Sequence, residues 1–389
     1  MKILSLTYEY PPIGGGGSVV AAAVNEELVR LGDEVTVLTS GMKGLPAEET
    51  VEGVAVHRTA CIRRHRHYTS TAELLTTLLP TYRRGAQLIR AIKPDVIHAH
   101  FILPSGPVAR ALSERFDVPY VLTAHGSDVP GYNPDRFGLM HRVLKPAWRQ
   151  IVEGASSVTS PSRFLAGLMR AQGCAVPISI VPNGHRPHPG LGTVRRNRVL
   201  VVARMFPRKG IQHFIDAVAG VESEWEFVIA GDGPFRDQLE AQARSVAPNV
   251  QFVGFVNREI LRSLYESSQI LVFPSIQENF PMVLLEAMDA GCAIVTTNAE
   301  GCAEVVGDAG LVVPTGDPQG IRAAFDKLMH EPELVRNLAG RARARAARLT
   351  WPNIVGRYRE VLQAAILQRS PTTTRTIEVP TASTPQALR

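Results

Sequence analysis

Short apolar runs rich in β-branched residues alternate with longer amphipathic stretches along most of the chain. Short runs of this kind bounded by glycine, proline and polar residues are typical of buried strands, and their alternation with helices predicts parallel sheets built from βαβ units. In the first half the predicted strands are 2–8, 34–39, 54–58, 95–99, 120–124, 157–160 and 178–181. In the second half they are 199–203, 226–230, 250–253, 270–273, 293–296 and 310–313.

A break in this pattern divides the chain into two parts. Residues 182–196 contain three prolines, three glycines and little apolar content, so we interpret the stretch from His185 as an interdomain linker. The fold class predicted is α/β, with one doubly wound parallel-sheet domain over residues 1–187 and a second over 188–350. Ligands of such sheets bind beyond the carboxyl ends of the strands, so a functional site is expected in a cleft between the two domains.

The C-terminal part has a different pattern. Residues 317–349 read as helical with a break at Pro332, and residues 351–367 read as a further amphipathic helix. Residues 368–389 are mainly Ser, Thr, Pro and Arg without a periodic apolar pattern, which predicts a disordered tail.

Composition narrows the class of protein. The chain has 389 residues, 45% of them hydrophobic and 20% charged, as expected for a globular protein of about two domains. Its four cysteines lie far apart without a CxxC pair, which indicates neither a disulfide framework nor a zinc site and favours a reducing compartment. We see no signal-peptide pattern and no run of ~18 apolar residues, and therefore expect a cytoplasmic protein that does not span a membrane.

The net charge of +6 favours anionic partners. Part of the excess lies in residues 51–90, where only Glu52 and Glu73 oppose the arginines Arg58, Arg63, Arg64, Arg66, Arg83, Arg84 and Arg90. One interpretation is a peripheral contact with the inner face of an anionic membrane, with the leucines of 74–79 as the apolar side of a helix. The other, which we favour, is a solvated face whose leucines pack on the sheet.

A glycine-rich turn follows the first predicted strand. The segment Tyr10-Pro-Pro-Ile-Gly14-Gly15-Gly16-Gly17-Ser18 leads into a helix, where backbone N–H groups and the helix dipole can hold a phosphate. Its spacing is neither a dinucleotide fingerprint nor a Walker loop. By itself the turn could equally be a loop without a ligand.

The second half supplies two charged pairs. Arg204 follows a strand and Lys209 precedes the next helix, so both cations could face one diphosphate, although a solvated basic turn is the simpler alternative. Glu278 lies in the loop after a later strand, and Glu286 lies about two turns into the following helix. Such carboxylates can hold sugar hydroxyls, or they can simply be solvated.

Taken together, these motifs resemble the family 4 (group 1) glycosyltransferases, retaining enzymes of the GT-B fold, from Met1 to about Leu367. The resemblance rests on a series of motifs in matching order: Tyr10-Pro-Pro with Gly15-Gly16, Asp95-Val-Ile-His-Ala-His100, Thr123-Ala-His125-Gly-Ser-Asp128, Val181-Pro-Asn-Gly184, Arg204 with Lys209, Gly231-Asp-Gly-Pro234, Glu278 with Glu286, and Glu304-Val-Val-Gly. It implies two Rossmann-like domains facing across a cleft, with the C-terminal helix crossing back to the first domain.

The resemblance also implies roles for single residues. Gly15 and Gly16 would lie against the donor diphosphate, which Arg204, Lys209 and the backbone at Met282 and Val283 would bind. Glu278 would hold the donor sugar, Glu286 the ribose, and Asn279 and Phe280 would complete the donor site. His125 would contact the transferred sugar, with a buried core histidine as the less favoured alternative, and His100 and Asp128 are acceptor-side candidates. The catalytic set would be His125, Glu278, Arg204 and Lys209.

The implied activity is transfer of a hexosyl unit from a UDP- or GDP-sugar to a hydroxyl acceptor, lipid-linked acceptors included, with retained anomeric configuration. No Asp-x-Asp motif occurs, so we expect neither a bridging metal nor any other cofactor, and no nucleic-acid partner. Pro281 departs from the family pattern after Glu-x-Phe, and this departure bears on the identity of the sugar. The alternatives are a GT-B-fold sugar-nucleotide epimerase or phosphorylase, and a catalytically altered partner subunit that only binds a nucleotide sugar.

Overall fold

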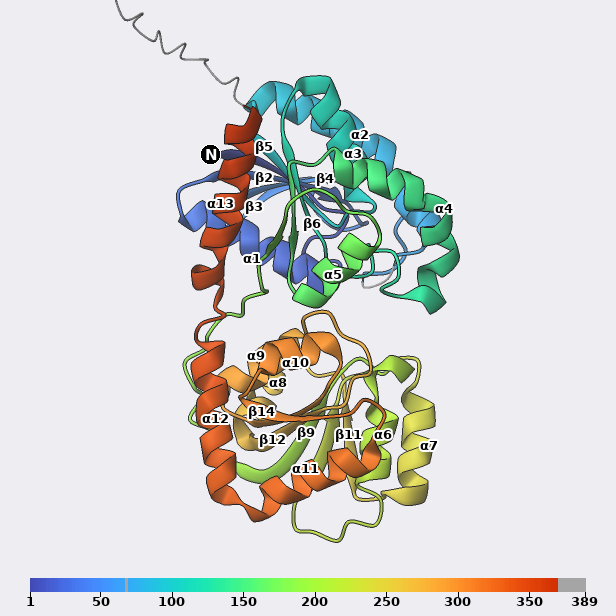
Figure 1. Cartoon of the computed structure of the whole chain (residues 1–389), viewed down its shortest axis with the longest axis vertical. Helices are drawn as coiled ribbons and strands as arrows, with labels where there is room; N and C mark the ends of the chain where they lie inside the picture. Colours follow the sequence, from blue (N-terminus) through green and yellow to red (C-terminus); the bar gives the residue numbers. More distant parts are fainter. Residues whose placement is uncertain (67–68, 370–389) are drawn as a thin grey trace, which may run out of the picture.

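The computed structural model describes residues 1–66 and 69–369, without the side chains of 134–141 and 369. Two stacked α/β units make up the molecule (Figure 1). The first unit holds an eight-stranded sheet and the second a six-stranded sheet. The fold class predicted from the sequence is therefore confirmed.

The first sheet has the strand order β3-β4-β2-β1-β5-β6-β7-β8. Its strands are β1 (Lys2–Leu6), β2 (Glu34–Ser40), β3 (Glu48–Val51), β4 (Val54–Thr59), β5 (Val96–His100), β6 (Tyr120–Thr123), β7 (Ser157–Ser160) and β8 (Ile178–Ile180). The helices are α1 (Gly16–Arg30), α2 (Thr71–Ile92), α3 (Ser105–Phe116), α4 (Pro134–Glu153) and α5 (Arg163–Ala171). All neighbouring strands run parallel except β3, which pairs antiparallel with β4.

The second sheet has the order β11-β10-β9-β12-β13-β14 and is parallel throughout. Its strands are β9 (Arg196–Val202), β10 (Glu226–Ala230), β11 (Val250–Gly254), β12 (Ser268–Phe273), β13 (Ala293–Thr297) and β14 (Gly310–Val313). The 3-10 turn η1 (Pro207–Lys209) precedes α6 (Ile211–Ala217), and the later helices are α7 (Arg236–Val246), α8 (Arg258–Ser267), α9 (Met282–Asp289), α10 (Glu300–Val306), α11 (Pro318–His330), α12 (Pro332–Ala346) and α13 (Trp351–Arg369).

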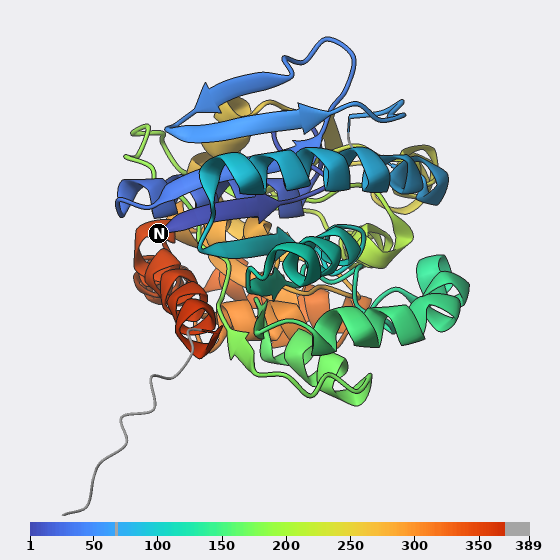
Figure 2. The same ribbon diagram turned by 90° about the horizontal axis from the view of Figure 1, so that it is seen from above.

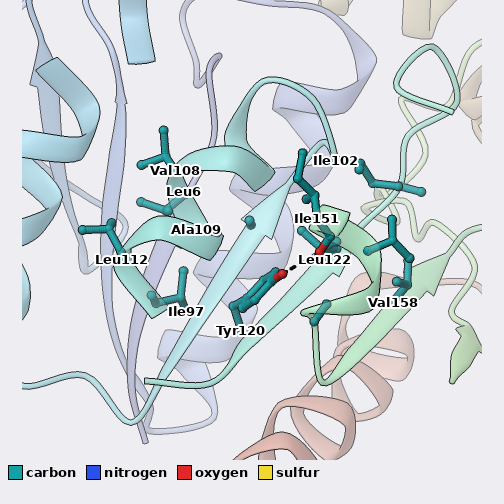
Figure 3. Packing of buried hydrophobic residues seen from close by; sticks show 14 of the residues in the cluster. Leu6, Ile97, Ile102, Val108, Ala109, Leu112, Tyr120, Leu122, Ile151 and Val158 are labelled. Carbon is teal, nitrogen blue, oxygen red and sulfur yellow. Dashed lines mark hydrogen bonds between the residues drawn. The ribbon is translucent and has the colours of Figure 1, made fainter. Parts of the chain in front are cut away.

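Both sheets are covered by helices, which explains why most strands read as apolar runs without alternation. Figure 3 shows part of the first core, where strand residues such as Leu6, Ile97 and Leu122 pack against α3. The buried hydroxyl of Tyr120 at the base of this core donates a hydrogen bond to the Ile151 carbonyl oxygen at 2.5 Å. Its polar atom is therefore satisfied inside an apolar cluster.

The C-terminal helix α13 returns to the first domain, as the resemblance implied. Trp351, Tyr358 and Leu362 are almost fully buried, and α13 packs against α1 and β5. Arg359 donates to the buried Asp33 carboxylate at 2.8 Å. Figures 1 and 2 show α13 along one edge of the first domain. The helix runs two residues beyond the predicted end, and the rest of the predicted tail lies outside the described residues.

The chain crosses between the domains twice, at neighbouring positions. His185 pairs with Thr350 in an isolated parallel bridge, through its N–H to the Leu349 oxygen (2.9 Å) and through its oxygen to the Trp351 N–H (3.1 Å). The two crossings therefore lie side by side at one end of the cleft. Within the described part of the chain, no helix has the length and apolarity needed to cross a bilayer.

Candidate active site

A cavity of about 1870 Å³ lies between the carboxyl ends of the two sheets. Of the residues singled out from the sequence, the first domain contributes Gly15, Gly16, His125 and Asp128 to its lining. The second domain contributes Arg204, Lys209, Glu278, Asn279, Phe280 and Met282. The fold thus brings ten of these positions, far apart in sequence, to one space.

The second-domain side of the cavity is built from two loops in contact. Gly210 has φ +68°, and a Cβ there would lie 1.9 Å from the Pro274 oxygen, so the loop after β9 can approach the end of β12 only with glycine at this position. The Ile276 N–H donates to the Arg208 oxygen at 2.9 Å and joins the loops. This contact places Lys209 beside Glu278.

Lys209 and Glu278 form a largely buried ion pair, with side chains 13% and 10% exposed. The Ser275 hydroxyl donates to the same Glu278 oxygen at 3.0 Å, which stabilises the carboxylate. The Arg204 Cζ lies 5.7 Å from the centre of the Phe206 ring. The Arg204 side chain is exposed and lines the cavity. Two cations and a carboxylate therefore face the cavity from one domain.

The glycine turn forms the opposite wall. Gly15 is the N-cap of α1, and a Cβ on Gly15 or Gly16 would meet no described atom within 4 Å, so the backbone borders open space. The N–H groups of the first turn of a helix have no intrahelical partners. An anion in the cavity can therefore approach this backbone closely.

Two charged residues whose place at the site was not predicted, Glu9 and Arg63, lie beneath this turn. Glu9 lines the cavity and accepts a hydrogen bond from the Gly15 N–H at 3.4 Å. Burial raises its pKa, while Arg63 and Arg204 oppose that shift. The Arg63 side chain is only 2% exposed and donates to the Tyr8 and Arg66 oxygens. Glu9 precedes Tyr10-Pro-Pro directly, which was the available sequence signal.

His125 follows β6 and is the member of a histidine cluster that lines the cavity, whereas His98 and His100 are fully buried. Its Nε2 lies 3.3 Å from His100 Nδ1, and the His100 ring lies 4.3 Å from that of His98. Burial lowers the pKa of His98 and of His125 to about 3 and that of His100 well below its usual range. All three are therefore neutral at pH 7, and the described residues include no cluster arranged to hold a metal ion.

The two acceptor-side candidates have buried positions. His100 is fully buried and is not among the described cavity-lining residues. The Asp128 carboxylate is 3% exposed and accepts from the N–H groups of Ile102 (2.8 Å), His125 (3.0 Å) and Gly126 (2.8 Å). Burial raises the Asp128 pKa against these hydrogen bonds. In this structure both side chains hold the His125 loop in place.

Asn279 connects the domains. Its Oδ1 accepts from the Ser162 hydroxyl at 2.6 Å and its Nδ2 donates to the His125 oxygen at 3.2 Å. Beside it, both oxygens of Glu304 accept from the Arg163 N–H at 3.0 and 2.9 Å. The loop that carries Glu278 is thereby tied to the loop that carries His125.

The remaining donor-site candidates lie on or near α9. Met282 and Phe280 line the cavity, whereas Val283 and Glu286 are not among its described lining residues. Glu286 is exposed and accepts from the Tyr265 hydroxyl at 3.2 Å. The role of Glu286 at the ribose stays a prediction.

Two doubly wound parallel sheets that face each other across one cavity, with a C-terminal helix crossing back, define the GT-B class of glycosyltransferases. Sucrose-phosphate synthase from Thermosynechococcus elongatus has this fold and matches with a TM-score of 0.79 at 22% identity, covering 94% of this chain and 99% of its own. HepE of Anabaena, solved in complex with UDP-glucose, matches with a TM-score of 0.72 at 20% identity, covering 94% and 100%.

Two family models together match most of the chain. The model for a glycosyl transferase 4-like domain matches residues 15–184, and the model for glycosyl transferases group 1 matches residues 191–345. Glycogen synthase of Mycobacterium tuberculosis is 29% identical, over 94% of this chain and 95% of its own length. The chain belongs to the group 1, family 4-type glycosyltransferases, as its motifs indicated.

Proposed function

We propose that the protein transfers a hexosyl unit from a nucleotide-diphosphate sugar to a hydroxyl acceptor with retention of anomeric configuration. The observation that carries this proposal is the placement of Arg204, Lys209 and Glu278 opposite Gly15 and His125 around one cavity. Cations and backbone N–H groups that converge from both domains suit a diphosphate. A neutral histidine and a carboxylate suit sugar hydroxyls.

A uridine nucleotide is the first donor to test. HepE, which shares the fold, was solved with UDP-glucose bound. A structural match at 20% identity indicates a shared fold and not a shared donor. We propose a UDP-sugar as the donor, and binding measurements with both UDP and GDP test this choice.

In the proposed reaction, the bond between the anomeric carbon and the diphosphate breaks while the acceptor oxygen bonds to the same face of that carbon. The hydroxyl proton passes to the leaving diphosphate. Arg204 and Lys209 would stabilise the negative charge that develops on the leaving group, which is the kind of fixed electrostatic help that lowers barriers most. No metal is assigned a role, and activity retained in excess EDTA is the expected result.

Two measurements test the proposal. Thermal shift with UDP, GDP and their sugars should raise the melting temperature with one base, because a ligand of the native state stabilises it by mass action. Proton NMR of the product formed from an α-linked donor should show an α-linkage. A β-linked product would refute retention, and stabilisation by neither nucleotide would refute the donor class.

The sequence favours a solvated face whose leucines pack on the sheet, but Leu75 and Leu79 are 64% and 55% exposed, so that part of the prediction is wrong. We therefore also propose a weak peripheral contact with anionic membranes through the first domain. Four arginines of residues 51–90 are engaged within the fold: Arg58 and Arg63 are buried, Arg84 pairs with Glu48, and Arg90 lies 5.2 Å from the Phe116 ring. Arg64, Arg66 and Arg83 are exposed. Charge reversal at these three should abolish co-sedimentation with anionic vesicles, and wild-type protein that fails to sediment at low salt would refute the contact.

A further inference from the structure

We propose that the acceptor is an amphiphile in which the hydroxyl-bearing head is joined to an alkyl chain, and that the chain lies in an apolar groove formed by α2, α3 and α4. This inference rests on the proposed function and specifies the acceptor half of the same cavity. The three helices lie together on one side of the first domain (Figure 1), with α3 in contact with both α2 and α4.

The cavity has room for a second substrate. At about 1870 Å³ it exceeds the roughly 300–1,000 Å³ of a typical ligand pocket. Beyond His125 it continues between the helices, where its lining includes Leu74, Leu75 and Leu78 of α2, Leu103 and Ala111 at α3, and Leu144 of α4. Because this space is continuous with the donor side, its occupant is the group that receives the sugar.

Along α3 and α4 the polar side chains of this groove are already hydrogen-bonded to the protein. Arg110 donates to Glu114 at 2.7 Å and to Gln150 at 3.0 Å. The Asp128 carboxylate accepts from three backbone N–H groups. Polar lining remains on the α2 side, where Arg66 and Thr69 border the cavity and the buried Thr69 hydroxyl has no described partner. An oligosaccharide along α3 and α4 would lose hydrogen bonds to water and gain few in return, and that loss is unfavourable.

An alkyl chain needs an apolar surface and no hydrogen-bond partners. Leu75 is 64% exposed and Leu144 is 37% exposed, yet both line the cavity. Covering such side chains with methylene groups is favourable by the hydrophobic effect. The apolar lining runs from the neighbourhood of His125 out to these exposed residues, which fits an extended chain behind a small polar head.

The chain offers matched controls on the same two helices. Leu79 of α2 is 55% exposed and Val143 of α4 is 69% exposed, but neither is among the described lining residues. The double variant Leu75→Asn with Leu144→Asn alters the groove. The double variant Leu79→Asn with Val143→Asn makes the same kind of change on the same helices outside it.

The experiment measures binding of methyl and n-octyl glucosides, galactosides and mannosides to the nucleotide-loaded protein, below the micellar concentration. In the wild type and in the control variant, at least one octyl glycoside should bind on the order of 30-fold more tightly than its methyl form. In the groove variant this ratio should fall to about threefold. Because the two glycosides are compared within each variant, a general loss of folding or of nucleotide affinity cancels from the ratio.

The inference fails if methyl and octyl forms bind equally, or if no octyl glycoside binds at all. Equal loss of the ratio in both double variants would also contradict it, because the groove would then have no special role. Nucleotide binding is measured first and separately. If neither UDP nor GDP binds, the proposed function itself fails, and that outcome is distinct from failure of the acceptor assignment.

Discussion

The two halves of the cavity differ in how their polar groups are used. On the second-domain side, Arg204 and the Lys209–Glu278 pair face the cavity. On the first-domain side, the polar groups that the sequence singles out bond to the protein itself, as the Asp128 carboxylate does, and leucines take over the lining. A diphosphate requires fixed positive charge whatever sugar it carries, whereas acceptors differ in chemistry. We therefore infer that the first domain determines the acceptor specificity of this chain.

The largest expected effect comes from removing charge on the donor side. Arg204→Met or Lys209→Met should lower kcat/KM by about 10²–10³, the range typical of losing one preorganised electrostatic contact to a transition state. Steady-state kinetics with the donor that stabilises the protein checks this. Activity within threefold of wild type for both variants would show that the charged half does not serve the leaving group.

A smaller effect is expected where the halves are joined. Asn279→Ala removes two hydrogen bonds between the domains, so kcat should fall about tenfold or more, since buried hydrogen-bonded groups left unpaired cost about 1–3 kcal/mol. Nucleotide affinity should change less than kcat. Ser162→Ala removes one of the two bonds and should show the same pattern more weakly. A variant that loses nucleotide binding and keeps its kcat would contradict this role.

The buried histidine cluster beneath the acceptor side can be examined through the pH dependence of protein stability. Because the folded-state pKa of His98 is about 3, the unfolded chain binds a proton below pH 6.5 that the folded chain does not, and stability must fall as the pH falls. Between pH 7 and pH 5 this histidine should cost about 2 kcal/mol of unfolding free energy. Urea unfolding at both pH values should show a loss smaller by that amount in His98→Gln, and equal losses would contradict the assignment.

Most of the fold could be predicted from the sequence because both sheets are buried on both faces. Strand β10 (Glu226–Ala230) has the bounds that the sequence predicts. The strand β3 (Glu48–Val51) was missed because a short edge strand with two glutamates has no apolar signal, and charge is what an exposed edge favours. Its antiparallel pairing with β4 comes from tertiary context alone.

The sequence predicts the site residues that belong to motifs, but it does not predict contacts that depend on tertiary packing. The loop positions of Arg204, Lys209 and Glu278 follow from motifs. No sequence spacing shows that the Asp128 carboxylate accepts hydrogen bonds from three backbone N–H groups.

The positions of the excess positive charges also depend on tertiary packing. Arg343 and Arg345 donate to carbonyl oxygens at the ends of α9 and α10, so part of the positive charge stabilises helix termini.

We propose that the charged half of the cavity, and not the apolar half, binds the donor diphosphate. The measurement is calorimetric titration of UDP, or of GDP if UDP does not bind, into wild-type protein, Lys209→Met and the double variant Leu75→Asn with Leu144→Asn. We predict that Lys209→Met weakens Kd by on the order of 30-fold, as expected for loss of a charge-assisted contact, while the double variant in the apolar groove leaves it unchanged. A nucleotide that binds Lys209→Met as tightly as wild type would contradict this assignment of the donor site.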